Sequence, residues 1–260
     1  MGVLYLKILV TGSTGQLGSA LPNHLKNSGY KVKLTSRRKP DGFEDFEWTY
    51  SDLSSGEGLE EAVKDADVIL HAATSPMKNS KSVEVSGFKE LLNKAQHVKH
   101  FIYPSIVGID EIPFNYYKLK LEAEELLKKS SIPHTIVRAT QFHHFIDHLF
   151  LSKPLLKRYI VPGKFKCQSV DAGEFAEHLI GLVDKDPQGR AEDFGGPAVM
   201  TLREMTELKI KLNNEPNKVL RLSLTGKLYN SFCDGKNTNP ARKMGKITFG
   251  EYLSEKIKGQ

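Results

Sequence analysis

LKILVTGSTGQLG, residues 6–18, joins a short apolar run to three glycines that are spaced three residues apart. The pattern predicts the opening strand, the phosphate-binding turn and the first helix of a nucleotide-binding βαβ unit, rather than a glycine-rich loop without a ligand. Gly12 lets the chain turn sharply, Gly15 lets the backbone approach a pyrophosphate, and Gly18 lets the helix pack closely on the strand. The phosphates then meet the positive end of that helix. The same turn contributes three further expected contacts, Thr14, Gln16 and Leu17.

The end of the second predicted strand, residues 31–35, indicates which nucleotide binds. An NAD-binding unit usually carries an acid at this point for the ribose hydroxyls, but here Ser36, Arg37 and Arg38 follow the strand. Guanidinium groups suit a 2′-phosphate because they present a planar fork of donors that stays charged. We therefore expect these three residues to bind the cofactor and NADP(H) to be preferred over NAD(H). A solvated basic turn is the alternative.

Length and composition fit a globular protein. The chain has 260 residues, 39% hydrophobic and 26% charged, which suits one large domain or two small ones. Its net charge of +6 comes from scattered lysines without an aromatic-basic motif, so we expect no nucleic-acid partner. Cys167 and Cys233 have no metal or redox spacing. With no signal peptide and no apolar run of membrane-spanning length, we expect a cytoplasmic protein without a membrane partner.

Strands and helices alternate along the first half of the chain. After the second strand, further strands are expected at residues 46–50, 67–71, 100–104 and 134–138, and helices at 58–64, 86–96 and 116–129. This alternation predicts an α/β fold, a Rossmann-like doubly wound parallel sheet. Ligands of such sheets bind outside the carboxyl ends of the strands. That rule selects Ser105 and, for the cofactor, Asp52, Leu53, Ala72, Ala73, Thr74, Ala139, Thr140 and Phe142.

Beyond about residue 150 the alternation weakens. We expect residues 1–150 to form the NAD(P)-binding domain and residues 151–260 a small, irregular C-terminal substrate lobe, part of which returns to the sheet. Helices are expected in this lobe at 172–183, 202–212 and 249–256. Asp171 and Thr201 should cap the first two of these helices. In the first domain, Pro22 lies inside the predicted first helix, where it should kink the helix or displace a hydrogen bond.

Several motifs together resemble those of the extended or atypical short-chain dehydrogenase/reductase superfamily, and more closely its NmrA-like branch. They are TGSTGQLG (11–18), TSRR (35–38), HAAT (71–74), YPSIVG (103–108), NYYKLKLEAE (115–124) and VRATQF (137–142). The resemblance implies that Lys120 holds the nicotinamide ribose and favours the ionised phenol of Tyr116. It further implies that Tyr116 exchanges a proton with a carbonyl oxygen, which Ser105 polarises, while a hydride moves.

The catalytic assignment has alternatives. Tyr252 and Lys256 repeat the Tyr-x-x-x-Lys spacing, and helix packing alone would also explain Tyr116. The first reading is an NADP(H)-dependent oxidoreductase acting on a small carbonyl, quinone or related electrophile. The second is a regulatory protein that senses NADP(H) without turnover and contacts a protein partner. A sugar-nucleotide epimerase or dehydratase is the third, disfavoured by the small C-terminal region and the basic residues after the second strand. The sequence leaves open whether the protein forms a homodimer.

His144 and His148 share one face of a predicted helix and could suggest a metal. Zinc normally needs at least three protein ligands, with a suitably placed acid or cysteine nearby, and no such set is evident. We therefore expect no metal site. These histidines should either line the pocket above the nicotinamide or take part in helix packing.

Overall fold

The computed structural model describes residues 5–259 and contains a central sheet in the order β3-β2-β1-β4-β5-β6-β9. The strands are β1 (Lys7–Thr11), β2 (Lys31–Ser36), β3 (Glu47–Tyr50), β4 (Val68–His71), β5 (His100–Ile106), β6 (His134–Ala139) and β9 (Gly189–Arg190). The pairings of β1 with β2 and β4, of β2 with β3, and of β4 with β5 are parallel. The strand order reverses at β1, so the predicted Rossmann-like doubly wound sheet is confirmed.

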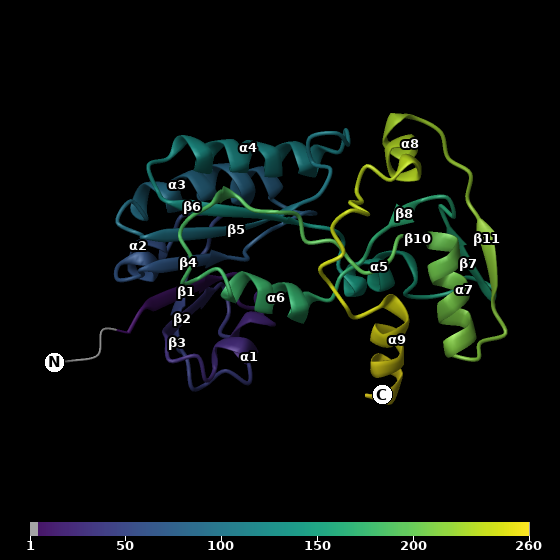
Figure 1. The fold of residues 1–260 in the computed structure, drawn as a ribbon, viewed down its shortest axis with the longest axis horizontal. Helices are drawn as coiled ribbons and strands as arrows, with labels where there is room; N and C mark the ends of the chain where they lie inside the picture. The colour runs from purple at the N-terminus through teal and green to yellow at the C-terminus, as the bar shows by residue number, and fades with distance from the viewer. Residues whose placement is uncertain (1–4, 260) are drawn as a thin grey trace. The chain divides into compact units, whose positions relative to one another are not determined.

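Two compact units make up the structure. Within the described residues, the first comprises 5–105, 115–137 and 176–191, and the second comprises 106–114, 138–175 and 192–259. In the first unit, α2 (Leu59–Val63), α3 (Phe88–Lys94) and α4 (Asn115–Lys129) cover one face of the sheet, and α1 (Leu21–Leu25) covers the other (Figure 1). The core on the three-helix face is apolar, with Ile69 and Phe101 of the strands among its buried residues.

The structure corrects two helix predictions in the first unit. Residues 12–20 form turns, in which Gly15 N donates to Gly12 O and Ser19 N donates to Gly15 O, and α1 begins only at Leu21. Pro22 therefore lies in the first turn of α1, where no amide hydrogen is needed, and not inside a helix as expected. The helix expected at 86–96 is α3, which follows directly on a π-helix, η1 (Ser82–Gly87).

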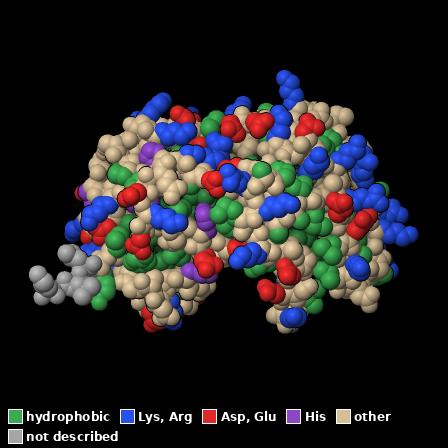
Figure 2. Space-filling model, viewed as in Figure 1, with side chains coloured by type: hydrophobic (Ala, Val, Ile, Leu, Met, Phe, Trp, Pro, Cys, Tyr) green, Lys and Arg blue, Asp and Glu red, His purple; other side chains and the backbone are tan. Residues whose placement is uncertain are grey.

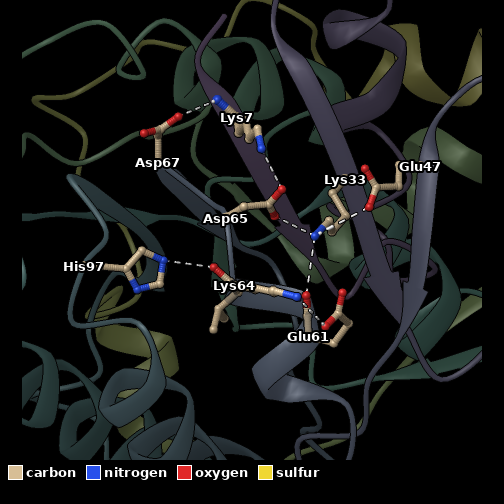
Figure 3. A network of polar contacts seen from close by, with 9 residues as sticks. Lys7, Lys33, Glu47, Glu61, Lys64, Asp65, Asp67 and His97 are labelled. Atoms are coloured by element: carbon tan, nitrogen blue, oxygen red, sulfur yellow. Dashed lines mark hydrogen bonds and ion pairs between the residues drawn. The ribbon is translucent and has the colours of Figure 1, made fainter. Parts of the chain in front are cut away.

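Charged side chains link the amino ends of the first strands (Figure 3). Asp65, which precedes β4, lies 2.7 Å from Lys7 Nζ of β1 and 2.8 Å from Lys33 Nζ of β2. Hydrogen bonds from Lys33 and Lys7 lower the pKa of Asp65. Lys33 also reaches Glu47 of β3 at 3.5 Å. Each exposed pair contributes little alone, but together they tie β1, β2 and β3 at the end of the sheet opposite the predicted site.

The second unit contains two small sheets and several helices. Strand β7 (Arg158–Val161) pairs in parallel with β11 (Lys218–Arg221), and β8 (Lys166–Cys167) pairs antiparallel with β10 (Met200–Thr201). The helices that lie wholly within it are α5 (His143–Phe150), α7 (Leu202–Leu212), α8 (Lys227–Asp234) and α9 (Phe249–Lys258), while α6 (Ala172–Ile180) continues into the first unit. Figure 2 shows Lys and Arg side chains gathered near β11, whose Lys218 and Arg221 are exposed.

The helix predictions for the second half of the chain are confirmed as α6, α7 and α9. Asp171 Oδ1 accepts from the backbone of Gly173 at 2.7 Å and of Glu174 at 3.1 Å, so it caps α6 as expected. Thr201 and Glu204 form a reciprocal capping box at the start of α7.

Candidate functional site

The three glycines of the turn after β1 have different surroundings. Gly12 has φ +66°, and a Cβ there would lie 2.5 Å from the Cα of Ala73. A Cβ on Gly18 would lie 2.0 Å from the carbonyl oxygen of Gly12. Gly15 is exposed, and its Cβ would meet only Gly12 O, at 3.2 Å. Gly12 and Gly18 are therefore needed to close the turn, whereas Gly15 leaves its backbone open to a ligand.

The other predicted residues of the turn also differ in their exposure to solvent. Thr14 and Gln16 are exposed beside Gly15, while Leu17 is buried. Thr14 and Gln16 are therefore open to a ligand, whereas the Leu17 side chain packs in the protein.

Ser36 connects the glycine turn to the ends of β2 and β3. Its Oγ accepts a hydrogen bond from Ser13 Oγ and from Trp48 Nε1, each at 3.1 Å, and donates to the carbonyl oxygen of Arg38. The side chains of Arg37 and Arg38 are exposed and make no ion pair within residues 5–259. The Ser36 side chain thus forms hydrogen bonds within the protein, whereas both guanidinium groups are accessible to an anion.

Asp52 and Leu53 follow β3. Asp52 Oδ1 accepts from Ser54 N at 2.8 Å and from Ser54 Oγ at 2.7 Å, which fixes the turn locally. The side chain of Leu53 is buried in the core of the first unit. Their expected cofactor contacts stay predictions.

The loop after β4 contacts the glycine turn. Ala72 and Ala73 lie directly against Gly12, and Ala73 N donates to Thr11 Oγ at 3.3 Å. The same Thr11 oxygen lies 2.9 Å from Nδ1 of His71. The structure therefore brings the predicted residues of β1 and β4 together at the carboxyl ends of the strands.

A hydrogen-bonded chain begins at Thr74 in this loop. Its Oγ donates to Glu84 Oε1 at 2.6 Å and lies 2.5 Å from Tyr116 Oη. Glu84 belongs to η1 and is 3% exposed. Sequence reasoning missed Glu84, because a single acid between charged and polar residues carries no motif and only the fold brings it to Thr74.

Lys120 is buried beside this chain. Its ammonium lies 3.7 Å from Glu84 Oε2, donates to the carbonyl oxygen of Pro104 at 3.2 Å, and lies 4.1 Å from the centroid of the Tyr103 ring. Burial lowers the pKa of Lys120, and the charges of Glu84 and Glu124 oppose that effect. A carboxylate, a carbonyl and an aromatic face thus compensate the buried ammonium.

The surroundings of Tyr116 differ from the expectation. Burial and then the charge of Glu84 raise the pKa of Tyr116, which is the opposite direction to the effect expected of Lys120. Both effects favour the neutral phenol over the phenolate. Ser105, near the carboxyl end of β5, is 5% exposed, and its hydroxyl has no hydrogen-bond partner in residues 5–259.

The remaining predicted cofactor residues belong to the second unit. Ala139 forms a bridge with Phe194, and Phe142 packs on Phe175 with ring centroids 6.0 Å apart. Thr140 Oγ donates to the carbonyl oxygen of Gln168 and accepts from Gly196 N at 3.3 Å. Their assignment to the cofactor stays a prediction.

The second copy of the Tyr-x-x-x-Lys spacing has a different environment. Lys256 Nζ lies 2.5 Å from Asp147 Oδ2, and Tyr252 Oη donates to the same oxygen at 3.3 Å. Both residues of α9 are therefore held by a carboxylate of α5.

His144 and His148 of α5 stack with ring centroids 5.8 Å apart, and residues 5–259 contain no group of three or more potential metal ligands.

We expect the buried His71 to make the protein less stable in acid. Burial lowers the pKa of His71 from 6.5 to about 3, with a further contribution from Lys120. Below pH 6.5 the unfolded chain therefore binds a proton at His71 that the folded protein does not bind. As the pH falls from 6.5 towards 3, the free energy of unfolding decreases by about 1.4 kcal/mol per pH unit. Urea unfolding at pH 7, 6 and 5 would measure the slope.

His71→Asn should keep a hydrogen-bond acceptor for Thr11 and lose this part of the slope, and His24→Asn, at an exposed position, should not change it. Equal slopes for His71→Asn and the unaltered protein would contradict this account.

The parallel sheet with a glycine turn after its first strand defines a dinucleotide-binding protein. The family model described as NAD(P)H-binding matches residues 12–145, and the chain belongs to that family. The fold is the one expected from the resemblance to the extended or atypical short-chain dehydrogenase/reductase superfamily. The NmrA-like branch stays a prediction.

Solved structures show the same fold over almost the whole chain. NADPH-dependent quinone oxidoreductase QOR2 from Escherichia coli, complexed with NADPH, has a TM-score of 0.77 at 17% identity, over 96% of this chain and 99% of that one. UDP-glucuronic acid 4-epimerase from Bacillus cereus, in complex with UDP-glucuronic acid and NAD, has a TM-score of 0.76 at 18% identity, over 98% and 99%. At these identities the likeness concerns the fold alone.

The similar curated proteins include an assembly factor and a reductase. Photosystem II assembly factor Ycf39 of Cyanophora paradoxa is 26% identical over 235 residues, which are 84% of this chain and 72% of that protein. Divinyl chlorophyllide a 8-vinyl-reductase of Cucumis sativus is 26% identical over 242 residues, 81% of this chain but only 58% of the reductase.

In the described part of the chain, the helices are too short or too polar to span a membrane.

Proposed function

We propose that the protein is an NADP(H)-dependent oxidoreductase that transfers a hydride to a small carbonyl, quinone or related electrophile. The observation that carries this proposal is the hydrogen-bonded chain from Tyr116 through Thr74 to Glu84, beside Lys120 and the loop that contacts the glycine turn. A neutral phenol in that place is a proton donor at the expected end of the sheet. The fold shared with an NADPH-dependent quinone oxidoreductase supports the proposal.

Each group has a role in this reaction. The backbone at Gly15 approaches the pyrophosphate, Arg37 and Arg38 bind the 2′-phosphate, and Lys120 contributes positive charge near the nicotinamide ribose. The bound nucleotide supplies the hydride. Ser105 and Tyr116 hydrogen-bond the carbonyl oxygen, and Tyr116 gives it a proton as negative charge develops there.

The proposal is tested by measuring NADPH oxidation with a panel of quinones, aldehydes and ketones. Turnover of at least one class, dependent on Tyr116, is the expected result. Tight binding of NADP⁺ and NADPH with no turnover across the panel would contradict it.

That second outcome would favour a regulatory protein whose NADP(H) occupancy changes its contacts with a partner. Two observations support this alternative. The ammonium of Lys120 is already satisfied by protein groups, and one relative is named as an assembly factor.

We expect the two arginines after β2 to determine the choice of cofactor. NADP(H) should bind at least ~10-fold more tightly than NAD(H), which corresponds to about 1.4 kcal/mol, because exposed guanidinium groups are available to the 2′-phosphate. Calorimetry with both nucleotides measures the difference. Replacing Arg37 and Arg38 together by alanine should remove the preference and leave NAD(H) binding nearly intact. Tighter binding of NAD(H) by the unaltered protein would contradict the assignment.

A further inference from the structure

Glu84 ends the hydrogen-bonded chain from Tyr116, but the roles assigned above give its buried carboxylate no step in the reaction. It lies in the π-helix η1, and π-helical turns are rare and recur at functional sites. The end of η1 packs tightly, since a Cβ on Gly87 would lie 1.8 Å from the carbonyl oxygen of Leu53. The backbone at the end of η1 is therefore closely packed.

The contacts of Glu84 set the direction of the hydrogen bonds around it. Glu84 Oε1 accepts from Thr74 Oγ at 2.6 Å and from the backbone of Ser75 at 2.7 Å. Since the single hydroxyl proton of Thr74 points to Glu84, Thr74 Oγ is the acceptor in its 2.5 Å contact with Tyr116 Oη. The phenol proton of Tyr116 is thus one hydroxyl away from a carboxylate.

We propose that Glu84 takes up and returns the proton of Tyr116 through the hydroxyl of Thr74. In alcohol oxidation, the substrate proton moves to the Tyr116 oxygen, the phenol proton moves to Thr74, and the Thr74 proton moves to Glu84. The hydride of the same alcohol carbon goes to the oxidised nucleotide, so one hydride and one proton leave the substrate. In the reduction every transfer is reversed, and protonated Glu84 restores the proton that Tyr116 has given to the product. The inference rests on the proposed function.

A purely structural explanation is that Glu84 only balances the charge of Lys120. The two explanations separate at Thr74, because Thr74→Val breaks the proton chain and leaves the carboxylate and the ammonium in place. Thr74→Ser restores the hydroxyl. Glu124 provides a matched control for Glu84, since it is 0% exposed and its charge also acts on Lys120.

The experiment measures the reduction of phenanthrenequinone by NADPH in mixtures of H₂O and D₂O, with thermal unfolding of each variant as the check on folding. For the unaltered protein, kcat should fall along a curve with deuterium content, because several protons move together. Glu84→Gln and Thr74→Val should lower kcat by about 10-fold or more and give a straight line, and Glu84→Gln should change KM for NADPH by less than about 2-fold. Thr74→Ser should restore the curve, and Glu124→Gln should keep kcat within about 2-fold.

The possible failures are distinguishable. An unaltered protein that does not oxidise NADPH overturns the proposed function and the relay together. If the protein turns over but Thr74→Val keeps its kcat and its curved isotope dependence, the relay is wrong and the proposed function stands. If Glu84→Gln does not fold, the comparison of Thr74→Val with Thr74→Ser still shows whether the Thr74 hydroxyl relays the proton.

Discussion

Gly12→Ala is expected to destabilise the first unit strongly. The new Cβ would lie 2.5 Å from the Cα and 2.6 Å from the backbone nitrogen of Ala73, atoms that cannot move aside as the end of a flexible side chain can. Overpacking against a fixed neighbour and a left-handed conformation at φ +66° together cost at least about 3 kcal/mol. That is a large part of the usual stability of a domain, about 5–15 kcal/mol.

Gly29→Ala is the matched control for this variant. Gly29 also has a positive φ, +79°, but a Cβ there would meet no atom within 4 Å. It should therefore cost only the backbone term, about 1 kcal/mol. Circular dichroism and urea unfolding measure both variants, and equal losses would show that the contact with Ala73 is unimportant.

Gly15→Val separates ligand binding from folding at the same turn. Gly15 is exposed and its φ is not positive, so a branched side chain should be accommodated with a small adjustment against Gly12 O. The side chain would nevertheless occupy the space where the pyrophosphate approaches the backbone. The variant should fold and bind NADPH at least ~100-fold more weakly, about 2.7 kcal/mol, by calorimetry. Unchanged affinity in a folded variant would exclude this turn as the phosphate site.

The glycines illustrate what the sequence could predict. The fold follows from local patterns, since apolar strands, helical periodicity and the glycine spacing each act within about twenty residues. The sheet order then follows from general rules on parallel βαβ connections. The spacing predicts separate roles for Gly12, Gly15 and Gly18. The structure shows close contacts at Gly12 and Gly18, but Gly18 packs on Gly12 O within the turn and does not bring a helix against the strand.

The proton chain could not be predicted in the same way. Thr74 and Tyr116 are 42 residues apart, and Glu84 joins them through a π-helix whose extra residue per turn has no simple sequence pattern. The direction of the Tyr116 pKa depends on burial and on the charge of Glu84, which only the packed structure defines. Local periodicity also overestimated the first helix, because the turns at residues 12–20 replace its expected start.

Tyr116→Phe is expected to lower turnover by roughly 10²-fold or more, the usual contribution of a positioned acid. The substitution keeps the ring and removes the hydroxyl that donates to Thr74, while Thr74 can still donate to Glu84. Affinity for NADPH should barely change. Steady-state kinetics with the best substrate of the panel, together with calorimetry, measure both quantities.

Lys120→Met should weaken turnover and NADPH binding together, because a positive charge near the ribose is lost. It also leaves Glu84 buried without its counter-charge, so the variant should lose about 3–5 kcal/mol of stability, and kinetics should be taken well below its unfolding temperature. In a regulatory protein the pattern differs: Tyr116→Phe is silent, and Lys120→Met acts only through binding and stability. Tyr252→Phe is the control, because its hydroxyl serves Asp147 in the second unit and should not affect turnover under either function. Full activity of Tyr116→Phe would therefore exclude the phenol as the proton donor even if the protein proved to be an oxidoreductase.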